Sequence, residues 1–357
     1  MTVTVRSFAK INLGLYIGSL RADGFHDLRT VYQTIALHDV IRVGVGRGTG
    51  IEIVCNDARV PGDASNTCHR IAERVLDELG AAGKVTIEIE KRLPVQGGLG
   101  AASSNAVATM VALERALRKR LLVSTRLRIA AEVGSDLPLF AVGGTVLGVG
   151  RGEEVYPLPD LPATPVVVVT PDVGVSTPKA FADWDELAAA ELRTAWTGEG
   201  ARRSTGTAGQ PRAAVPTQAR EGVATQDRLT GVGGSDRLHE VGRALSAWLV
   251  SPNTGAPAMG RSRAGSLLLD LVRTGIENDF EKVVFSQSPE LRDIKGVLKR
   301  SGASYASLSG SGSSLYGLFP TRTAAVRAVG RLRKQGLRAV ATSTLTRAQY
   351  WKKIVDC

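Results

Sequence analysis

The chain has 357 residues and 43% hydrophobic content, which is enough for two domains with a core each. No uncharged apolar run reaches membrane-spanning length, and the first ten residues lack the apolar centre of a secretion signal. The three scattered cysteines have no C-x-x-C spacing and indicate neither a disulfide framework nor a zinc site. We therefore expect a cytoplasmic protein with reduced thiols.

The formal net charge of +11 would suit an anionic partner such as nucleic acid. Aromatic residues, however, make up only 5% of the chain, and the basic residues are scattered instead of forming a stripe interleaved with stacking rings. We expect the charge to attract small phosphorylated ligands, with neither nucleic acid nor membrane as a partner.

The segment 3–20 alternates apolar and polar residues as a strand does. Lys10 and Asn12 are two positions apart, so on a strand they share one face. Lys10 is the only charged residue between positions 7 and 19. Such a lysine usually extends its charged end to solvent, but beside an asparagine it could serve as an active-site cation.

The next segment, RADGFHDLRTVYQTI, turns at Asp23-Gly24 and then brings Phe25, His26 and Tyr32 into a short span. The rings could stack on a flat heteroaromatic ligand while the imidazole hydrogen-bonds to it. The alternative is a turn followed by a strand whose aromatic residues pack in the core.

The sequence KRLPVQGGLGAASSNAVATMVAL, residues 91–113, leads from a predicted strand into a predicted helix. Gly97, Gly98 and Gly100 permit positive φ and a close approach of an anion to the backbone amides. The unpaired N–H groups and the dipole of the helix would face that anion. Ser103 and Ser104 add hydroxyls for a phosphate oxygen or a magnesium ion.

A glycine-rich loop before a helix is often only a tight turn, and this one matches neither G-x-x-x-x-G-K-[ST] nor G-x-G-x-x-G. Two further segments bear on it. Asp136 follows a predicted helix in GSDLPLF, where it either caps the next turn or points a carboxylate into a cleft. The segment 306–319, ASLSGSGSSLYGLF, is either a flexible linker or a loop laid against the phosphate-binding turn.

The remaining pattern predicts a second domain that begins near residue 166. The composition changes at about 195–235 to Gly, Thr, Ala, Arg and Gln, which indicates a low-complexity insertion. The expected elements are strands within 36–60, a helix over 66–79, a helix over 125–133, a strand over 166–169, helices over 185–194, 237–249, 267–281 and 323–335, and a strand over 337–344.

The trio AKINL, LPVQGGLGAASSNA and SLSGSGSS, in this order and spacing, resembles the GHMP kinase superfamily, named for galacto-, homoserine, mevalonate and phosphomevalonate kinases. The resemblance covers residues 1–184 and 237–352. It implies a two-domain α+β fold, with a ribosomal-protein-S5-like N-terminal domain and a ferredoxin-like α/β sandwich as the C-terminal domain. We place the first in residues 1–160 and the second in 161–357, which includes the insertion.

The resemblance also implies an ATP-dependent kinase whose catalytic pair is Lys10 and Asp136. A carboxylate can accept the proton of an alcohol as the bond to phosphorus forms, and a lysine can neutralise the transferring phosphoryl group. Magnesium would be held through the ATP phosphates, with Ser104 as the one candidate side-chain ligand. The implied ATP-binding residues are Pro94, Gly97, Gly98, Leu99, Gly100, Ala101, Ala102, Ser103 and Ser104.

The motifs DGFHDL, SSNA and GSDLPLF resemble the branch that phosphorylates the erythritol part of a cytidine diphosphate substrate. His26 would then bind the cytosine edge, Phe25 and Phe181 would sandwich its face, and Asn12 would contact the alcohol end. The implied substrate-binding residues are Asn12, Phe25, His26, Tyr32, Phe181, Gly310, Ser311 and Gly312.

Two departures and two alternatives accompany this interpretation. Ala101 and Ala102 stand where many members have glycines, and the tyrosine and phenylalanine of the base pocket are exchanged in Phe25 and Tyr32. The alternatives are a GHMP kinase for another alcohol, such as homoserine or mevalonate, and a nonenzymatic regulator on the same scaffold. We expect a monomer or a weak homodimer.

Overall fold

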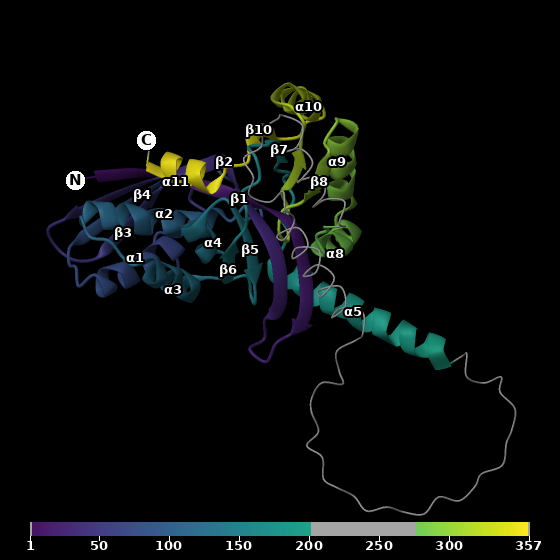
Figure 1. Ribbon diagram of the computed structural model, residues 1–357, viewed down its shortest axis with the longest axis horizontal. Coiled ribbons are helices and arrows are strands. Elements are labelled where there is room, and N and C mark those ends of the chain that lie inside the picture. Colours follow the sequence, from purple (N-terminus) through teal and green to yellow (C-terminus); the bar gives the residue numbers. More distant parts are fainter. Residues whose placement is uncertain (1, 201–275, 356–357) are drawn as a thin grey trace, which may run out of the picture.

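The computed structural model describes residues 2–200 and 276–355, which form two adjoining α+β parts (Figure 1). The N-terminal part contains a six-stranded sheet with the order β3-β4-β2-β5-β6, in which β1 also pairs with β2. Its strands are β1 (Thr2–Leu20), β2 (His26–Gly46), β3 (Ile51–Cys55), β4 (Lys84–Glu90), β5 (Thr145–Val149) and β6 (Glu154–Pro157). Its helices are α1 (Thr67–Glu78), α2 (Ala101–Ala116), α3 (Val123–Val133) and α4 (Leu137–Val142).

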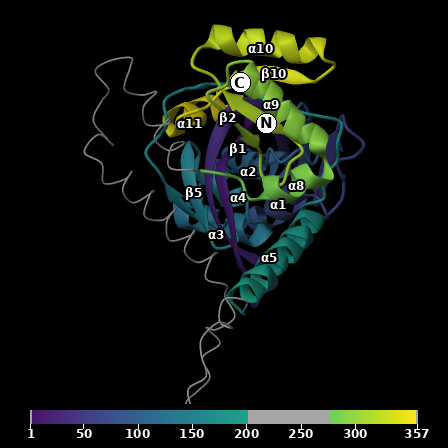
Figure 2. The same ribbon diagram turned by 90° about the vertical axis from the view of Figure 1, so that its right-hand side faces the viewer.

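The C-terminal part contains a four-stranded sheet with the order β10-β7-β9-β8. Figure 2 shows α8, α9 and α10 over the outer side of this sheet. Its strands are β7 (Pro165–Val169), β8 (Tyr305–Leu308), β9 (Leu315–Leu318) and β10 (Ala339–Ser343). Its helices are α5 (Thr177–Gly200), α8 (Phe280–Gln287), α9 (Pro289–Arg300) and α10 (Arg322–Lys334), and α11 (Arg347–Val355) ends the described chain.

The long antiparallel hairpin of β1 and β2 joins the two parts. The first half of β1 lies in the N-terminal core with Phe8, and its end lies in the C-terminal core with Leu15 and Ile17. Between them, Ile11 and Leu13 enter a third apolar cluster that also takes residues from β7 and β9. Strand alternation therefore turns the residues between them, Lys10 and Asn12, away from this cluster and toward the site.

Several expected elements are confirmed, and most of their boundaries differ by one or two residues. Helix α1 begins after Asn66, whose side chain accepts a hydrogen bond from the Cys68 amide at 2.9 Å and caps the helix. Helix α5 extends beyond the expected 185–194 on both sides, so residue 195 lies inside it and not at the start of an irregular segment.

The expected helix over 267–281 is wrong at residues 276–279, whereas its last two positions, 280 and 281, are helical. Residues 276–279 are not helical, and Asn278 forms a bridge to Leu15 before α8 begins at Phe280. β1 is an edge strand at Leu15, and its pairing with Asn278 overrides the helical pattern of the sequence. The expected helix over 237–249 and residues 201–235 of the insertion lie outside the described residues.

The second domain also does not run unbroken to the C-terminus. Helix α11 lies back on the N-terminal part near α2 (Figure 1), and Tyr350 and Ile354 join the N-terminal core. In residues 2–200 and 276–355, no helix has the length and hydropathy to cross a membrane. Cys55 and Cys68 are free thiols, and burial raises the pKa of Cys68 to about 12, which leaves it unreactive.

Candidate active site

Lys10 and Asp136 meet where the two parts adjoin. The Lys10 Nζ lies 3.5 Å from Asp136 Oδ2, with the lysine side chain 5% exposed and the aspartate 35% exposed. Asp136 directly precedes α4, two positions before Pro138, and its side chain makes no capping hydrogen bond. The carboxylate is therefore available to a ligand, and the ammonium group is held beside it.

Asn12 holds the lysine in place. Its Oδ1 accepts a hydrogen bond from Lys10 Nζ at 2.6 Å, and its Nδ2 donates to Thr30 Oγ1 at 2.7 Å. The Tyr316 hydroxyl from β9 donates to the Asn12 carbonyl at 2.7 Å. Because the buried Asn12 amide is occupied on both sides, the structure gives it a positioning role toward Lys10 in place of the expected contact with the alcohol.

Tyr32 contacts Asp136, so its hydroxyl lies beside the pair of Lys10 and Asp136. Its ring is buried, and its hydroxyl donates to Asp136 Oδ1 at 3.0 Å. Burial raises the pKa of the Tyr32 hydroxyl well above its usual range, and the charge of Asp136 raises it further. The hydroxyl therefore remains a donor, which orients the carboxylate and stabilises its charged form. Tyr32 is on β2 opposite Asn12 on β1, and this register brings it here.

The central loop packs directly on Lys10. The Lys10 amide donates to the Leu99 carbonyl at 3.0 Å, while the Leu99 side chain lies in the core. Gly100 has φ of 68°, and a Cβ there would lie 3.0 Å from Lys10 Cγ. Glycine at position 100 is thus required both by its backbone conformation and by the lysine stem beside it.

The other two glycines make room for neighbouring protein atoms, backbone at Gly98 and side chains at Gly97. A Cβ on Gly98, whose φ is 73°, would overlap the Ser309 carbonyl oxygen. Gly97 does not have positive φ, contrary to expectation, but a Cβ there would lie 2.8 Å from Pro94 Cγ and 2.9 Å from Ser314 Oγ. The close approach predicted for an anion is therefore made, at these two positions, by the loop between β8 and β9.

The glycine-rich loop between β8 and β9 closes on the central loop, as the sequence predicts. Ser309 Oγ donates to the Gly98 carbonyl at 2.9 Å, and a Cβ on Gly310 would lie 3.4 Å from Lys10 Nζ. Asn278 supports this loop, because its Nδ2 donates to the carbonyls of Leu308 and Gly310.

The two other loop residues named from the sequence have partners within the C-terminal part. The Ser311 hydroxyl lies 2.7 Å from Thr177 Oγ1, at the start of α5. A Cβ on Gly312, whose φ is 96°, would lie 3.1 Å from a methyl group of Leu308. These contacts fix the course of the loop over the Lys10 site.

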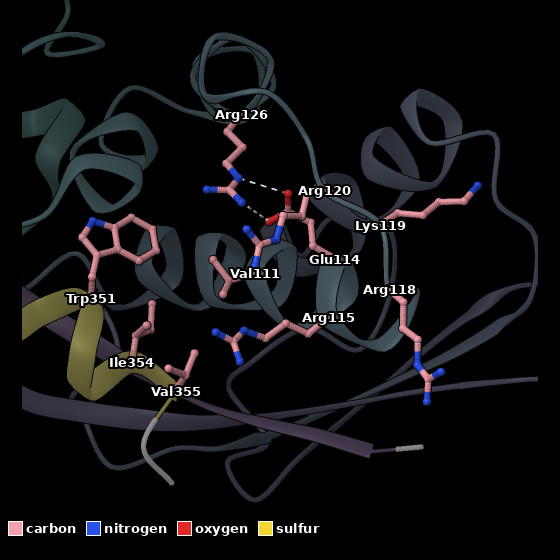
Figure 3. Close-up of a pocket in the computed structure, with 10 residues that line it drawn as sticks. All are labelled: Val111, Glu114, Arg115, Arg118, Lys119, Arg120, Arg126, Trp351, Ile354 and Val355. Carbon is pink, nitrogen blue, oxygen red and sulfur yellow. Dashed lines mark hydrogen bonds and ion pairs between the residues drawn. The ribbon is translucent and has the colours of Figure 1, made fainter.

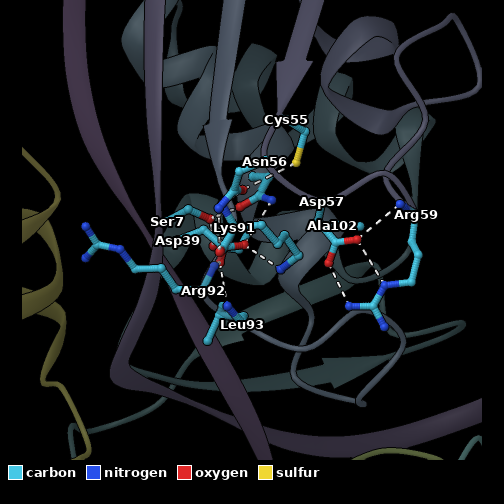
Figure 4. A network of polar contacts seen from close by, with 12 residues as sticks. Ser7, Asp39, Cys55, Asn56, Asp57, Arg59, Lys91, Arg92, Leu93 and Ala102 are labelled. Carbon is cyan, nitrogen blue, oxygen red and sulfur yellow. Dashed lines mark hydrogen bonds and ion pairs between the residues drawn. The ribbon is translucent and has the colours of Figure 1, made fainter.

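A buried carboxylate fixes the entrance of the central loop (Figure 4). Asp39 on β2 is fully buried and accepts hydrogen bonds at 2.7 Å from Lys91 Nζ and from the amides of Arg92 and Leu93. The side-chain amide of Asn105, on α2, donates to the same carboxylate at 3.1 Å. Both ends of the glycine-rich segment are thus tied to one strand.

Helix α2 offers its N-terminus to an anion. Its N-cap is Gly100, no side chain caps it, and Ala102 and Ser103 are at least partly accessible. Ser104, by contrast, is buried: its hydroxyl donates to the Phe8 carbonyl at 2.6 Å and accepts from Ser7 at 2.7 Å. The first-turn amides fit a phosphate group, whereas the Ser104 hydroxyl does not fit the expected contact with phosphate or magnesium.

The aromatic group near the hairpin turn has a different arrangement from the expected sandwich. The His26 ring stacks on Phe181 at a centroid distance of 4.9 Å, and His26 Nε2 lies 2.7 Å from Asp185 Oδ1. Phe25 is 51% exposed, with the Arg151 guanidinium 5.0 Å from its ring centre. Phe181 therefore occupies the face of His26 itself, and Phe25 projects from the turn.

Sequence reasoning missed Asp39, Asn278, Thr30 and Asp185. The sequence offered a signal only for Asp39, which is a single acidic residue in an apolar stretch. Because a carboxylate is rarely buried without a partner, this position indicates a buried ion pair. Their contacts join segments far apart in the chain, which no local pattern reveals.

The contact of Lys10 with Asp136 beneath two glycine-rich loops is the arrangement implied by the resemblance to the GHMP kinases, and the comparisons assign the chain to that class. Consistent with this, the family model "GHMP kinases N terminal domain" matches residues 66–144, and "GHMP kinases C terminal" matches residues 261–337.

Comparison with individual relatives identifies a family within this class. The 4-diphosphocytidyl-2-C-methyl-D-erythritol kinase of Solibacter usitatus is 35% identical over 97% of this chain and 95% of the relative. The enzyme of that name from Heliobacterium modesticaldum is 32% identical over 98% of each. A crystal structure of 4-(cytidine 5'-diphospho)-2C-methyl-D-erythritol kinase has a TM-score of 0.63 at 26% identity and covers 96% of this chain and 99% of its own. The chain belongs to the 4-diphosphocytidyl-2-C-methyl-D-erythritol kinase family.

Proposed function

We propose that the chain transfers the γ-phosphoryl group of ATP to the 2-hydroxyl of 4-diphosphocytidyl-2-C-methyl-D-erythritol, a step of the methylerythritol phosphate route to isoprenoid precursors. Family membership supports this reaction. The single observation that carries the chemistry is the contact of Lys10 with Asp136 beneath both glycine-rich loops.

In this reaction the substrate hydroxyl oxygen bonds to the γ-phosphorus, the bond from that phosphorus to the β,γ-bridging oxygen breaks, and ADP leaves. Asp136 Oδ2 accepts the hydroxyl proton. Lys10 Nζ neutralises charge on the transferring group, and it is positioned by Asn12. Tyr32 holds the other carboxylate oxygen, so that one oxygen faces the alcohol.

ATP would place its phosphates at the first turn of α2, between Gly98 and Ser103. Magnesium, when bound, neutralises the phosphate oxygens. Among the described residues there is no group of three or more His, Cys, Asp or Glu side chains that could hold a metal. We propose that the ion arrives on the nucleotide and is held mainly by it. The monomeric or weakly dimeric state and the cytoplasmic location remain predictions from the sequence.

For the cytidine end, we propose His26, Phe25 and Phe181 as the binding group. The base would enter between the exposed Phe25 and the stacked pair of His26 and Phe181, and Phe181 would separate from His26 if the base takes that face. Asp185 beside His26 Nε2 would orient the imidazole.

The test is phosphoryl transfer from ATP with magnesium to the cytidine substrate, with homoserine and mevalonate run alongside. We expect product from the cytidine substrate alone. Asp136→Asn should abolish turnover and leave ATP binding within about threefold, because the amide keeps the shape but cannot accept the proton. Turnover of only another alcohol, or normal turnover by Asp136→Asn, would contradict the proposal.

A further inference from the structure

A basic pocket lies on the N-terminal part, where the end of α2, the turn after it and α11 meet (Figure 3). It has a volume of about 520 Å³, within the range of small-molecule sites. Its walls carry Arg115, Arg118 and Arg120 on one side and Trp351 and Ile354 on the other.

Three of the four arginines that line this pocket have no carboxylate partner among the described residues. The only carboxylate in the wall, Glu114, is buried and paired with Arg126 at 2.9 Å, and its Oε1 also accepts from the Leu121 amide. None of the carboxylates that the structure describes pairs with Arg115, Arg118 or Arg120. Cations without a described carboxylate partner that line one hollow favour an anion.

The opposite wall is apolar and aromatic. Trp351 is half-buried, and Ile354 and Val355 continue the wall along α11. In Figure 3, Arg115 and Arg126 point toward this wall, whereas Arg118 and Lys119 point away from its centre. A ligand that fits both walls has a phosphate group at one end and an aromatic or apolar group at the other.

We propose that this pocket binds a small phosphorylated molecule with an aromatic or apolar portion, at a site separate from the catalytic one. Hydrogen bonds connect α11, which forms the apolar wall, to the helix that follows Asp136. Trp351 Nε1 donates to the Val142 carbonyl at 3.0 Å, and the Tyr350 hydroxyl donates to the Phe140 carbonyl at 2.7 Å. Both carbonyls belong to α4, the helix that directly follows Asp136.

The test uses 1-naphthyl phosphate as the probe, measured by isothermal titration calorimetry with the catalytic site saturated by magnesium and a nonhydrolysable ATP analogue. Inorganic phosphate and 1-naphthol serve as half-probes, which measure the binding of the phosphate group and of the aromatic ring of the probe separately. The variant is the double substitution Arg115→Ala and Arg120→Ala. Arg118 is left in place because its side chain points away from the pocket in Figure 3, and Lys119 because its Nζ donates to the Leu79 carbonyl.

The matched control is Arg322→Ala with Arg327→Ala, which removes the same charge from exposed positions of α10. We expect the probe to bind more tightly than either half-probe, and the pocket variant to weaken it at least about tenfold, since two charge-assisted contacts are lost. The control should bind as the parent does.

Equal affinity in the parent and the pocket variant would overturn the proposal, as would an equal loss in the control. A protein that binds an RNA oligonucleotide through these arginines but not the naphthyl probe would also overturn it, in favour of a macromolecular anion.

Discussion

The hydrogen bond from Tyr32 to Asp136 gives the sharpest test of the proposed catalytic group. Tyr32→Phe removes one hydroxyl and keeps the buried ring, so the core around β2 stays filled. The lost bond runs 3.0 Å to a carboxylate, and a hydrogen bond to a charged group contributes about 1.5–3 kcal/mol. Because the Asp136 side chain is 35% exposed, water can replace part of it, and the lower end of that range applies.

A loss of about 1.4 kcal/mol predicts a fall in kcat of about tenfold, with the KM for ATP unchanged. The hydroxyl holds one carboxylate oxygen, so we expect its loss to misorient the carboxylate and to act on the chemical step and not on ATP binding.

The assay is single-turnover phosphoryl transfer, which isolates the chemical step from product release. Tyr305→Phe is the matched control, because its hydroxyl lies within hydrogen-bond distance of the backbone carbonyls of Leu13 and Ile276. A single-turnover rate that is unchanged in Tyr32→Phe, or that falls equally in Tyr305→Phe, would refute the assignment.

Three further substitutions test other parts of the site. His26→Ala should raise the KM for the cytidine substrate at least about tenfold and that for ATP less than about threefold, in steady-state kinetics; equal losses would undo the base pocket. Asp39→Asn should lower the free energy of unfolding by about 3–5 kcal/mol in urea titrations, because it breaks a fully buried pair with Lys91; an unchanged midpoint would contradict this. Ser104→Ala should lower stability by about 1 kcal/mol while leaving the magnesium dependence of turnover unchanged, and a raised magnesium requirement would restore Ser104 as a ligand.

Local sequence pattern was sufficient for most of the fold and for the centre of the site. The alternation around Lys10 and Asn12 correctly predicted one shared face, because the strand period is a property of neighbouring residues. Likewise, the glycine-rich turn before α2 was recognisable from composition alone. The family resemblance then supplied what pattern could not, namely that Lys10 and Asp136, 126 positions apart in the sequence, meet.

The expected side-chain positions that the structure does not match depend on contacts between segments far apart in the chain. Tyr32 and Phe25 look interchangeable as aromatic residues near a turn, yet strand register puts one beside Asp136 and leaves the other exposed. Ser104 reads as a phosphate ligand because it follows glycines, but helical rotation turns it inward to Phe8 while Ser103 stays accessible. In both cases the local pattern identified the type of residue but not the direction in which its side chain points.

The glycines of the central loop show why both parts of the chain are needed for one site. Gly98 is required because the Ser309 carbonyl occupies the space of its missing side chain, and Gly97 because Pro94 and Ser314 do the same. Ser309 also donates to the Gly98 carbonyl, so the central loop is held against the C-terminal part. The same contact places Gly310 over Lys10. The proposed phosphate-binding turn and the proposed catalytic lysine are therefore held by one contact between the parts, and we expect a displacement of the β8–β9 loop to disturb nucleotide binding and phosphoryl transfer together.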